Sequence, residues 1–170
     1  MSSAQEWVQV VDACNRPCGS ATRAFIRRFK LWHQASYIFV YNAAGALCVQ
    51  RRTLTKDIFP GAYDLAAGGV VDAGESPHVG ACRELKEELG IRCRRLKHCF
   101  DFRYTDQRLH CFGSVYMTEH NGALALQPSE VADVQWLMPH DALALDNVTP
   151  DTRVALSLLL EGGWLNGADT

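Results

Sequence analysis

The sequence has no run of about twenty apolar residues, and it does not begin with basic residues followed by an apolar stretch. We therefore expect no membrane partner and a cytoplasmic location. A linker rich in Pro, Gly or Ser is missing as well, and so is any internal repeat. A chain of 170 residues with 48% hydrophobic content can bury a sizeable core, which favours one domain over residues 1–170.

The chain also lacks a strong excess of charge. Its 17 Lys and Arg against 19 Asp and Glu give a formal net charge of −2. Proteins that mainly grip nucleic-acid backbone usually carry a large positive charge, so we do not expect nucleic acid as the main partner. The basic clusters at 27–30 and 92–97 are typical of solvated faces.

The cysteines lack the spacing of a zinc site. The pair Cys14-x3-Cys18 has no companion pair, and Cys93 and Cys99 are expected to lie along one strand region. In a cytoplasmic protein we expect reduced thiols, several of them packed as small apolar residues. The seven cysteines are Cys14, Cys18, Cys48, Cys82, Cys93, Cys99 and Cys111.

What the sequence does contain is a specific motif in residues 69–91, GVVDAGESPHVGACRELKEELGI. Its spacing is G-x5-E-x7-R-E-(aliphatic)-x-E-E-x-G-(aliphatic). Ser76 is a favourable N-cap with Pro77 after it, and Gly90 tolerates the left-handed conformation that ends many helices. These signals predict a helix over 77–89. The motif is formed by Gly69, Glu75, Arg83, Glu84, Leu85, Glu87, Glu88, Gly90 and Ile91.

Three acids of the motif, Glu84, Glu87 and Glu88, stand at positions i, i+3 and i+4 of the predicted helix. Their carboxylates then project from one face, where like charges repel. A hard divalent cation turns this repulsion into coordination, and Mg2+ is the usual ion when the substrate carries phosphates. The competing interpretation is a solvated helix face, which requires neither the glycines at 68–69 nor Glu75 at its fixed distance.

Other residues of the motif predict how the helix is positioned. Arg83 is expected to orient Glu75 or Glu84 through charged hydrogen bonds. The glycines at 68–69 allow the backbone to approach a ligand closely. Apolar residues on roughly the opposite helix face predict inward packing, and these are Val79, Cys82, Leu85 and Leu89.

Elsewhere, β-rich runs and turn residues predict antiparallel hairpins around the central helix. Residues 1–32 are expected to form an extension with a strand and a short helix, separated by a turn at 15–22. The predicted strands lie at 7–12, 36–42, 46–52, 91–104, 111–118 and 134–137, and the predicted helices at 22–28, 77–89, 139–145 and 150–161.

On its motif the chain resembles the Nudix superfamily, and the resemblance covers most of the sequence. It implies an α+β fold, a Nudix-type α/β/α sandwich with a mixed, mainly antiparallel sheet. It also implies cleavage, dependent on Mg2+ or alternatively Mn2+, of a phosphoanhydride bond in a nucleoside-diphosphate-linked or other diphosphate-containing small molecule. By the same resemblance Glu87 and Glu88 are the main metal ligands and the Gly69 carbonyl is an additional donor. Glu84 is then a further ligand or the base acting on water.

A second candidate for the base lies outside the motif. Some Nudix enzymes take the base from a later loop, and Glu130 precedes a predicted strand in PSEVADVQW. Loops often carry function, but an exposed loop acid without a role is the competing interpretation. Glu84 and Glu130 therefore both stay open as the base.

Further stretches resemble type I isopentenyl diphosphate isomerase, a branch of the same superfamily. That enzyme uses a Cys-Gly-His stretch, where this chain has Ala67-Gly68-Gly69, so the thiol and the first metal-binding histidine are absent. His33 alone remains of the metal ligands, and we expect it to be a partly buried, hydrogen-bonded histidine. The resembling stretches are His33-Gln34-Ala35, Gln50-Arg51-Arg52-Thr53, Lys56, Pro60-Gly61, Asp101-Phe102-Arg103-Tyr104, Glu130-Val131 and Gln135-Trp136.

The isomerase-like stretches keep positive charge that suits a diphosphate. Arg52 and Lys56 are expected to place this charge over a phosphate, with Arg51 or Arg103 assisting. Because side chains alternate along a strand, only one of Arg51 and Arg52 is expected to reach the site. The competing interpretation is a solvated strand edge that carries basic residues.

Three functions are compatible with these patterns. A Mg2+-dependent pyrophosphohydrolase is favoured, because every acid of the motif is kept while the isomerase cysteine is lost. An enzyme like isopentenyl diphosphate isomerase and a non-catalytic nucleotide-binding module are the alternatives. The apolar run at 154–160 is compatible with a monomer or a homodimer.

Overall fold

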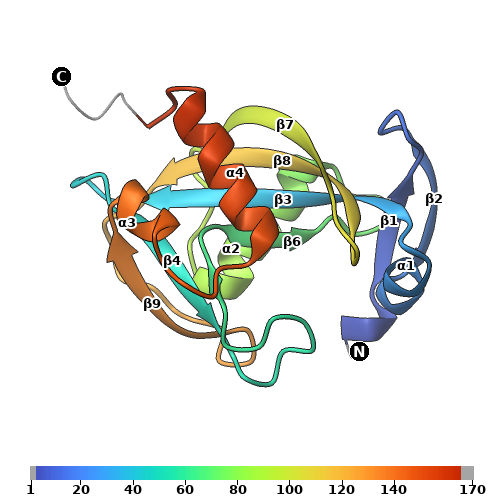
Figure 1. Ribbon diagram of the computed structural model, residues 1–170, viewed down its shortest axis with the longest axis horizontal. Coiled ribbons are helices and arrows are strands. Elements are labelled where there is room, and N and C mark those ends of the chain that lie inside the picture. The colour runs from blue at the N-terminus through green and yellow to red at the C-terminus, as the bar shows by residue number, and fades with distance from the viewer. Residues whose placement is uncertain (1–2, 166–170) are drawn as a thin grey trace.

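A computed structural model describes residues 3–165, which form a nine-stranded mixed sheet with helices on both faces (Figure 1). The ends of the range 1–170 that we expected as one domain lie outside the described residues. The strands are β1 (Trp7–Val11), β2 (Pro17–Thr22), β3 (Trp32–Tyr41), β4 (Leu47–Arg52), β5 (Tyr63–Asp64), β6 (Ala67–Val70), β7 (Lys97–Thr105), β8 (His110–Glu119) and β9 (Val131–Leu137). The helices are the 3-10 turn η1 (Ser3–Gln5), α1 (Arg23–Phe29), α2 (Pro77–Leu89), α3 (Pro139–Leu143) and α4 (Pro150–Glu161).

Strand β3 organises the sheet. It runs parallel to β8 along its whole length and antiparallel to β6 from Ala35, which faces Val70, to Ile38, which faces Ala67. It also contacts β1 and β4, while β4 pairs with β5 and β9 in antiparallel fashion. The prediction of a mixed, mainly antiparallel sheet is therefore confirmed.

The two faces of β3 explain the layers. Tyr37 and Phe39 point into one core, which also contains Leu156 and Leu159 of α4. The alternate residues Ile38 and Val40 belong to a second core, which contains Ala81, Leu85 and Leu89 of α2. Because side chains of a strand alternate between faces, one strand supports α4 on one side and α2 on the other. This is the expected α/β/α sandwich.

Helix α2 begins and ends where its local signals predict. The Ser76 hydroxyl accepts a hydrogen bond from the Val79 N–H at 3.3 Å, and Gly90 ends the helix with φ of 69°. The expected inward face is only partly right, because Val79 is 53% exposed and Cys82 is half-buried. The helix packs instead through residues spaced by four, Ala81, Leu85 and Leu89, all fully buried.

Two secondary-structure predictions are wrong. Residues 15–22 were expected to form a turn, yet 17–22 form β2, which pairs with β1 from Trp7 opposite Thr22. The residues of β2, PCGSAT, are mostly exposed and have no alternating apolar pattern that would predict a strand. The strand expected over 91–104 begins only at Lys97, because the chain first turns back along α2 after Gly90.

The expectation of reduced thiols is also wrong for two cysteines. Cys82 of α2 and Cys93 of the segment after it are joined by a disulfide, with their Cα atoms 5.4 Å apart. Cys93 therefore does not share a strand with Cys99. The buried residues Cys48 and Cys111 are free thiols packed in the core, as predicted for small apolar residues.

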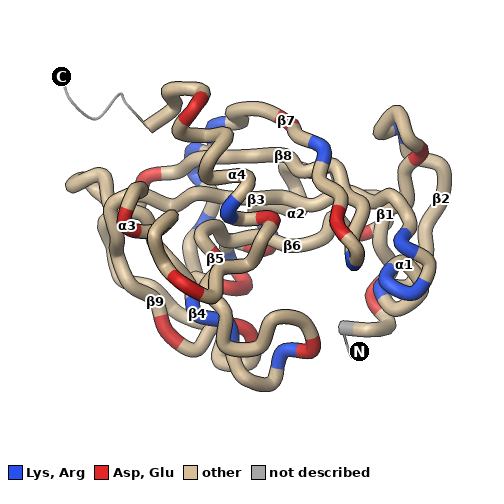
Figure 2. Tube along the Cα trace, viewed as in Figure 1, with Lys and Arg blue, Asp and Glu red and all other residues tan. Residues whose placement is uncertain are grey.

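Residues of the N-terminal extension form β1, β2 and α1, which stand together at one end of the sheet (Figure 1). Lys and Arg are concentrated on α1 (Figure 2). Within residues 3–165 we find no helix with the length and apolar character needed to cross a membrane.

Candidate active site

A cavity of about 460 Å3 brings the acids of α2 together with basic residues from distant parts of the chain. Glu84, Glu87 and Glu88 line it from α2, and Gly68 and Gly69 line it from β6. Further walls come from α1, from the loop at 53–61 and from the turn between β7 and β8. The three predicted metal ligands thus share one concave site.

Glu84 lies deep in this site. Its side chain is 15% exposed and accepts a hydrogen bond from Arg83 Nη1 at 2.9 Å. Burial raises the pKa of Glu84 to about 7, against the charge of Arg83, which lowers it, and with the charge of Glu87, which raises it further. A second cation beside Glu84 would therefore stabilise the charged form of its carboxylate.

Glu88 lies beside Glu84 and has only neutral hydrogen-bond donors. Its Oε2 accepts from the Gln50 side chain at 3.2 Å and from the Gly68 N–H at 3.1 Å. Burial raises the pKa of Glu88 well above its usual range, and the nearby charge of Glu84 raises it further. Two half-buried carboxylates therefore face each other's charge, and of the two Glu84 is the one paired with Arg83.

The glycines of β6 permit this close arrangement. Gly68 has φ of 139°, and a Cβ atom there would collide with the backbone carbonyl of Ser36. A Cβ atom on Gly69 would stand 2.6 Å from Glu84 Oε1. Glycine at both positions thus lets the β6 backbone pass directly against the acids.

Arg83 holds the acids in place, as its position in the motif predicts. Its Nε and Nη2 donate to the two carboxylate oxygens of Glu75 at 2.9 and 3.1 Å. The Nη1 atom donates to Glu84, and Nη2 also donates to the Val70 carbonyl at 3.3 Å. Arg83 therefore contacts both acids between which the sequence left a choice.

The chemistry of these donors fits a hard divalent cation. Carboxylate oxygens are the ligands that Mg2+ and Mn2+ prefer. Glu84 and Glu88 are half-buried and Glu87, with a side chain 57% exposed, stands at the opening. A cation between them would offset the raised pKa values of Glu84 and Glu88, because it favours their charged forms.

Of the expected phosphate-binding residues, Lys56 and Arg52 line the cavity. The Lys56 ammonium forms an ion pair with Glu130, which lines the same cavity. Arg52 Nη1 donates to Asp64 at 2.9 Å, and its Nε and Nη2 donate to the carbonyl of Ile58. Arg52 thus braces the loop at 53–61, while Arg51 points away and is exposed, as strand alternation predicts.

Arg103 lies outside the cavity, whereas His33 is part of its lining. The Arg103 guanidinium stacks 4.5 Å from the centre of the Trp32 ring, and among the described residues Arg103 is not part of the cavity lining. His33 is buried, and its Nδ1 is 3.0 Å from the Leu31 carbonyl. Burial lowers the pKa of His33, so it is the hydrogen-bonded histidine that we expected.

Sequence reasoning missed several residues of the site. Gln50, which positions Glu88, lies in one of the isomerase-like stretches, but the strand pattern there does not predict its contact with α2. The sequence predicts a solvated face for Arg27, but Arg27 lines the cavity and pairs with Asp57. On the opposite wall Asp151 accepts from the Tyr37 hydroxyl at 2.8 Å, and burial raises the pKa of Asp151 to about 6, helped by the charge of Asp64.

Comparisons with known proteins identify the family of this chain. The family model described as NUDIX domain matches residues 31–159. The uncharacterized Nudix hydrolase YfcD of Escherichia coli is 39% identical over 164 residues, which cover 96% of this chain and 91% of YfcD. An uncharacterized Nudix hydrolase of Pseudomonas aeruginosa is 41% identical over 167 residues, which cover 94% of this chain and 96% of that protein.

Solved structures share the fold. The crystal structure of DR0079 from Deinococcus radiodurans has a TM-score of 0.78 at 23% identity, covering 90% of this chain and 98% of that one. The NUDIX domain of Shewanella oneidensis NrtR, complexed with ADP ribose, has a TM-score of 0.65 at 18% identity, covering 83% and 98%. With the motif in place on α2 and relatives matched over most of their length, this chain belongs to the NUDIX domain family, that of the Nudix hydrolases.

Proposed function

We propose that the protein is a Mg2+-dependent hydrolase that cleaves a phosphoanhydride bond in a nucleoside-diphosphate-linked or other diphosphate-containing small molecule. The single observation that carries this proposal is the crowding of Glu84 and Glu88 against the glycine backbone of β6 inside one cavity. Crowded, half-buried carboxylates are costly without a cation. A divalent metal ion bound by these carboxylates removes that cost, and its remaining coordination positions suit the oxygens of an anionic substrate.

The proposed metal ligands are Glu84, Glu87, Glu88 and the Gly69 carbonyl. Mg2+ held there would neutralise charge developing on the diphosphate and make a bound water more acidic. Other residues of the protein orient these ligands. Gln50 and the Gly68 N–H hold one oxygen of Glu88, while Arg83 fixes Glu84, so the ligand oxygens are oriented before substrate arrives.

In the proposed reaction a water oxygen bonds to one phosphorus, and the bridging oxygen leaves with the other phosphate. The proton of the water passes to a carboxylate, and both Glu84 and Glu130 line the cavity where this happens. Lys56 and Arg52 bring positive charge to the same cavity, which suits phosphate oxygens. Arg23 and Arg27 of α1 add further positive charge to the cavity.

The proposal is tested by measuring release of phosphate or nucleoside monophosphate with Mg2+. The substrate panel holds nucleotide sugars, ADP ribose, dinucleoside polyphosphates, oxidised nucleotides and coenzyme A derivatives. We expect turnover of at least one class, abolished by Glu88→Gln and unchanged by Glu161→Gln, which alters an exposed acid at the end of α4. Binding of a panel member without any turnover would instead support the non-catalytic module.

A second experiment separates the two candidate bases. If Glu130 accepts the proton, Glu130→Gln lowers kcat by about 10²- to 10⁴-fold while Mg2+ affinity is unchanged. If Glu84 accepts it, Glu130→Gln has little effect on kcat, and Glu84→Gln lowers both kcat and Mg2+ affinity. Asp133→Asn serves as the control, because Asp133 is an exposed acid of β9 near Glu130.

The isomerase alternative is tested directly as well. Isopentenyl diphosphate incubated with the protein in deuterated water would exchange protons at carbon if the protein were an isomerase, and NMR detects that exchange. We expect none, because Ala67 occupies the position of the catalytic cysteine in the isomerase-like stretch.

A further inference from the structure

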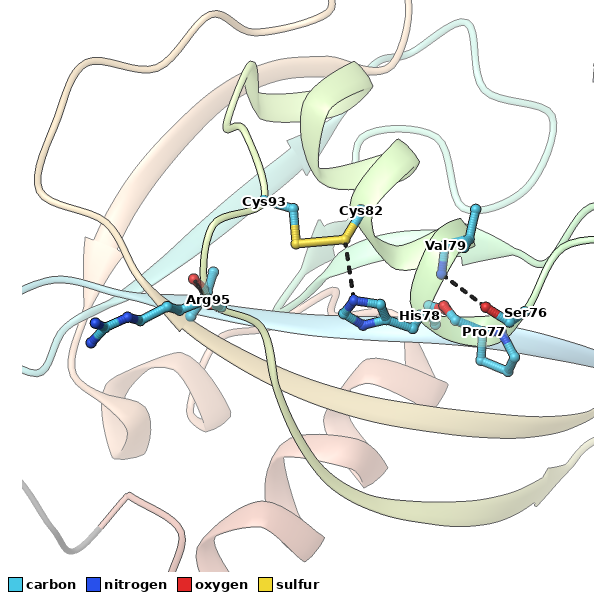
Figure 3. Close-up of a disulfide and its surroundings, with 9 residues drawn as sticks. Ser76, Pro77, His78, Val79, Cys82, Cys93 and Arg95 are labelled. Atoms are coloured by element: carbon cyan, nitrogen blue, oxygen red, sulfur yellow. Dashed lines mark hydrogen bonds between the residues drawn. A yellow bond between two sulfur atoms is a disulfide. The ribbon is translucent and has the colours of Figure 1, made fainter.

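A second cluster of metal-binding side chains lies on α2, apart from the acids. His78 and Cys82 stand at i and i+4, so they project from the same side of the helix. Cys93 reaches them from the segment that follows α2 (Figure 3). None of the three lines the cavity described above. The proposed hydrolysis therefore does not use these three residues.

The three side chains lie close enough together to hold one metal ion. The donor atoms of His78, Cys82 and Cys93 all lie within 4.8 Å of one another. His78 Nε2 is 3.9 Å from Cys82 Sγ, and Cys82 is bonded to Cys93. Two sulfurs and one imidazole nitrogen form a donor set for Zn2+ and similar ions, with a fourth position left to water.

We propose that His78, Cys82 and Cys93 form a thiolate site for Zn2+ or an ion of the same class, and that the Cys82–Cys93 disulfide is its oxidised, closed state. The site is separate from the proposed Mg2+ site in its residues and in its chemistry. It goes beyond the proposed hydrolase function and does not depend on it.

Opening the site is a two-electron reduction by low-molecular-weight thiols. One thiolate bonds to a sulfur of the disulfide and releases the other cysteine, and a second thiolate then releases the first cysteine. The two small thiols leave as their own disulfide. Zn2+ next replaces the two thiol protons and bonds to both sulfurs and to neutral His78. A small-molecule disulfide that accepts two electrons reverses the first reaction.

The charge around the cluster favours thiolate ligands over neutral ones. His78 shares a surface hollow with Arg92, Arg94, Arg95 and Lys97. A divalent cation held by neutral ligands would add two positive charges beside this basic rim. Two thiolates cancel both charges, so the complex is neutral and is not repelled.

The supports of α2 do not depend on the disulfide. Ser76 caps the start of the helix, and Leu85 and Leu89 are fully buried in the core. Both sulfurs are half-buried and His78 is exposed, so thiols and metal ions from solvent can reach the cluster. Reduction is thus expected to open the site while the helix stays folded.

The first test uses Co2+ as a spectroscopic substitute for Zn2+. Protein reduced with millimolar thiol and then freed of it under inert gas is titrated with Co2+. We expect the intense near-ultraviolet charge-transfer band of cobalt–thiolate bonds, saturating at about one ion per chain, and its loss on adding Zn2+. The band identifies sulfur ligands, so Co2+ bound by the acids of the cavity does not produce it.

Variants assign the ligands. Cys82→Ser and Cys93→Ser are each expected to lose the band, and His78→Ala to bind Zn2+ at least about tenfold more weakly. Cys18→Ser, which alters an exposed free cysteine, is the matched control and keeps the band. Glu88→Gln also keeps it, which separates a failure of this site from a failure of the proposed hydrolase.

Alkylation of the reduced wild-type protein gives a second measurement that needs no variant. Mass spectrometry is expected to show that Zn2+ protects Cys82 and Cys93 but not Cys18. The proposal is overturned if the folded protein's disulfide resists millimolar thiol, if the reduced protein shows no band, or if Cys93→Ser retains it.

Discussion

The buried carboxylate of Glu84 makes the metal-free protein sensitive to pH. Burial raises its pKa from 4.5 to about 7, so the folded state binds this proton more tightly than the unfolded state. The free energy of unfolding therefore falls as pH rises from about 4.5 through 7, on the order of 3 kcal/mol for this group. We expect Glu84→Gln to remove that part of the pH dependence, measured by urea unfolding with EDTA present.

The comparison is made at pH 5 and pH 8. Glu84→Gln is expected to gain stability relative to the wild type at pH 8 and to gain little at pH 5. Glu119→Gln changes an exposed acid and is expected to leave the pH dependence intact. Greater destabilisation of Glu84→Gln at pH 8 than at pH 5 would show that Glu84 is stabilising as a carboxylate without metal.

Arg83 stabilises the folded protein, because its guanidinium is the cation that Glu75 and Glu84 share. Arg83→Ala leaves Glu75 and Glu84 without their charged donor, and we expect a loss of about 2–4 kcal/mol in the free energy of unfolding. Arg83→Lys keeps the charge but not the paired contacts with Glu75, and should recover only part of this loss.

Chemical denaturation at pH 8 measures these differences. Arg92→Ala, which removes an exposed arginine just beyond α2, is expected to cost less than about 0.5 kcal/mol. Equal stability of Arg83→Ala and Arg92→Ala would contradict the account of Arg83 as the residue that holds the acids.

Helix α2 offers a matched pair of truncations. Leu85 is fully buried between α2 and the sheet, whereas Val79 is 53% exposed. Leu85→Ala is expected to lower the free energy of unfolding by about 2–5 kcal/mol through the cavity it leaves, and Val79→Ala by less than about 0.5 kcal/mol. Similar losses in the two variants, measured by thermal or urea unfolding, would show that the packed face of α2 has been misplaced.

The bounds of α2 could be predicted because they depend on neighbours in sequence. Ser76 and Gly90 act within a turn of their own positions. Strand β2 could not be predicted in the same way, because its exposed residues are ordered only by pairing with β1. The prediction that Val79 packs inward is wrong. Hydrophobicity alone does not tell which of two neighbouring rows of apolar residues on α2 packs against the sheet.

At the level of the complete chain, the candidate site combines predictable and unpredictable parts. The spacing of Glu84, Glu87 and Glu88 predicts a shared face, since helix geometry alone brings them together. The position of Glu88 in the cavity depends on Gln50 and Gly68, which β4 and β6 bring to α2. These contacts join segments that are distant in the sequence, so no local sequence pattern predicts them.

Two other contacts were not predicted from the sequence for the same reason, because they join segments that are far apart or that meet only through a reversal of the chain. Asp64 and Asp151 interact although 87 positions separate them, because β5 and the start of α4 meet at the cavity. Cys82 and Cys93 are joined because the chain reverses after Gly90. The spacing of His78 and Cys82 was the one available signal for that cluster, and it becomes informative only once Cys93 lies beside them.

The central claim is that the acids on α2 are kept close together because they bind Mg2+ together with an anionic anhydride. Isothermal titration calorimetry of Mg2+ at neutral pH tests it most directly, with a mixture of pyrophosphate compounds present. We expect saturable Mg2+ uptake by the wild type and its loss in Glu88→Gln. No divalent uptake by the wild-type protein under these conditions would contradict the account.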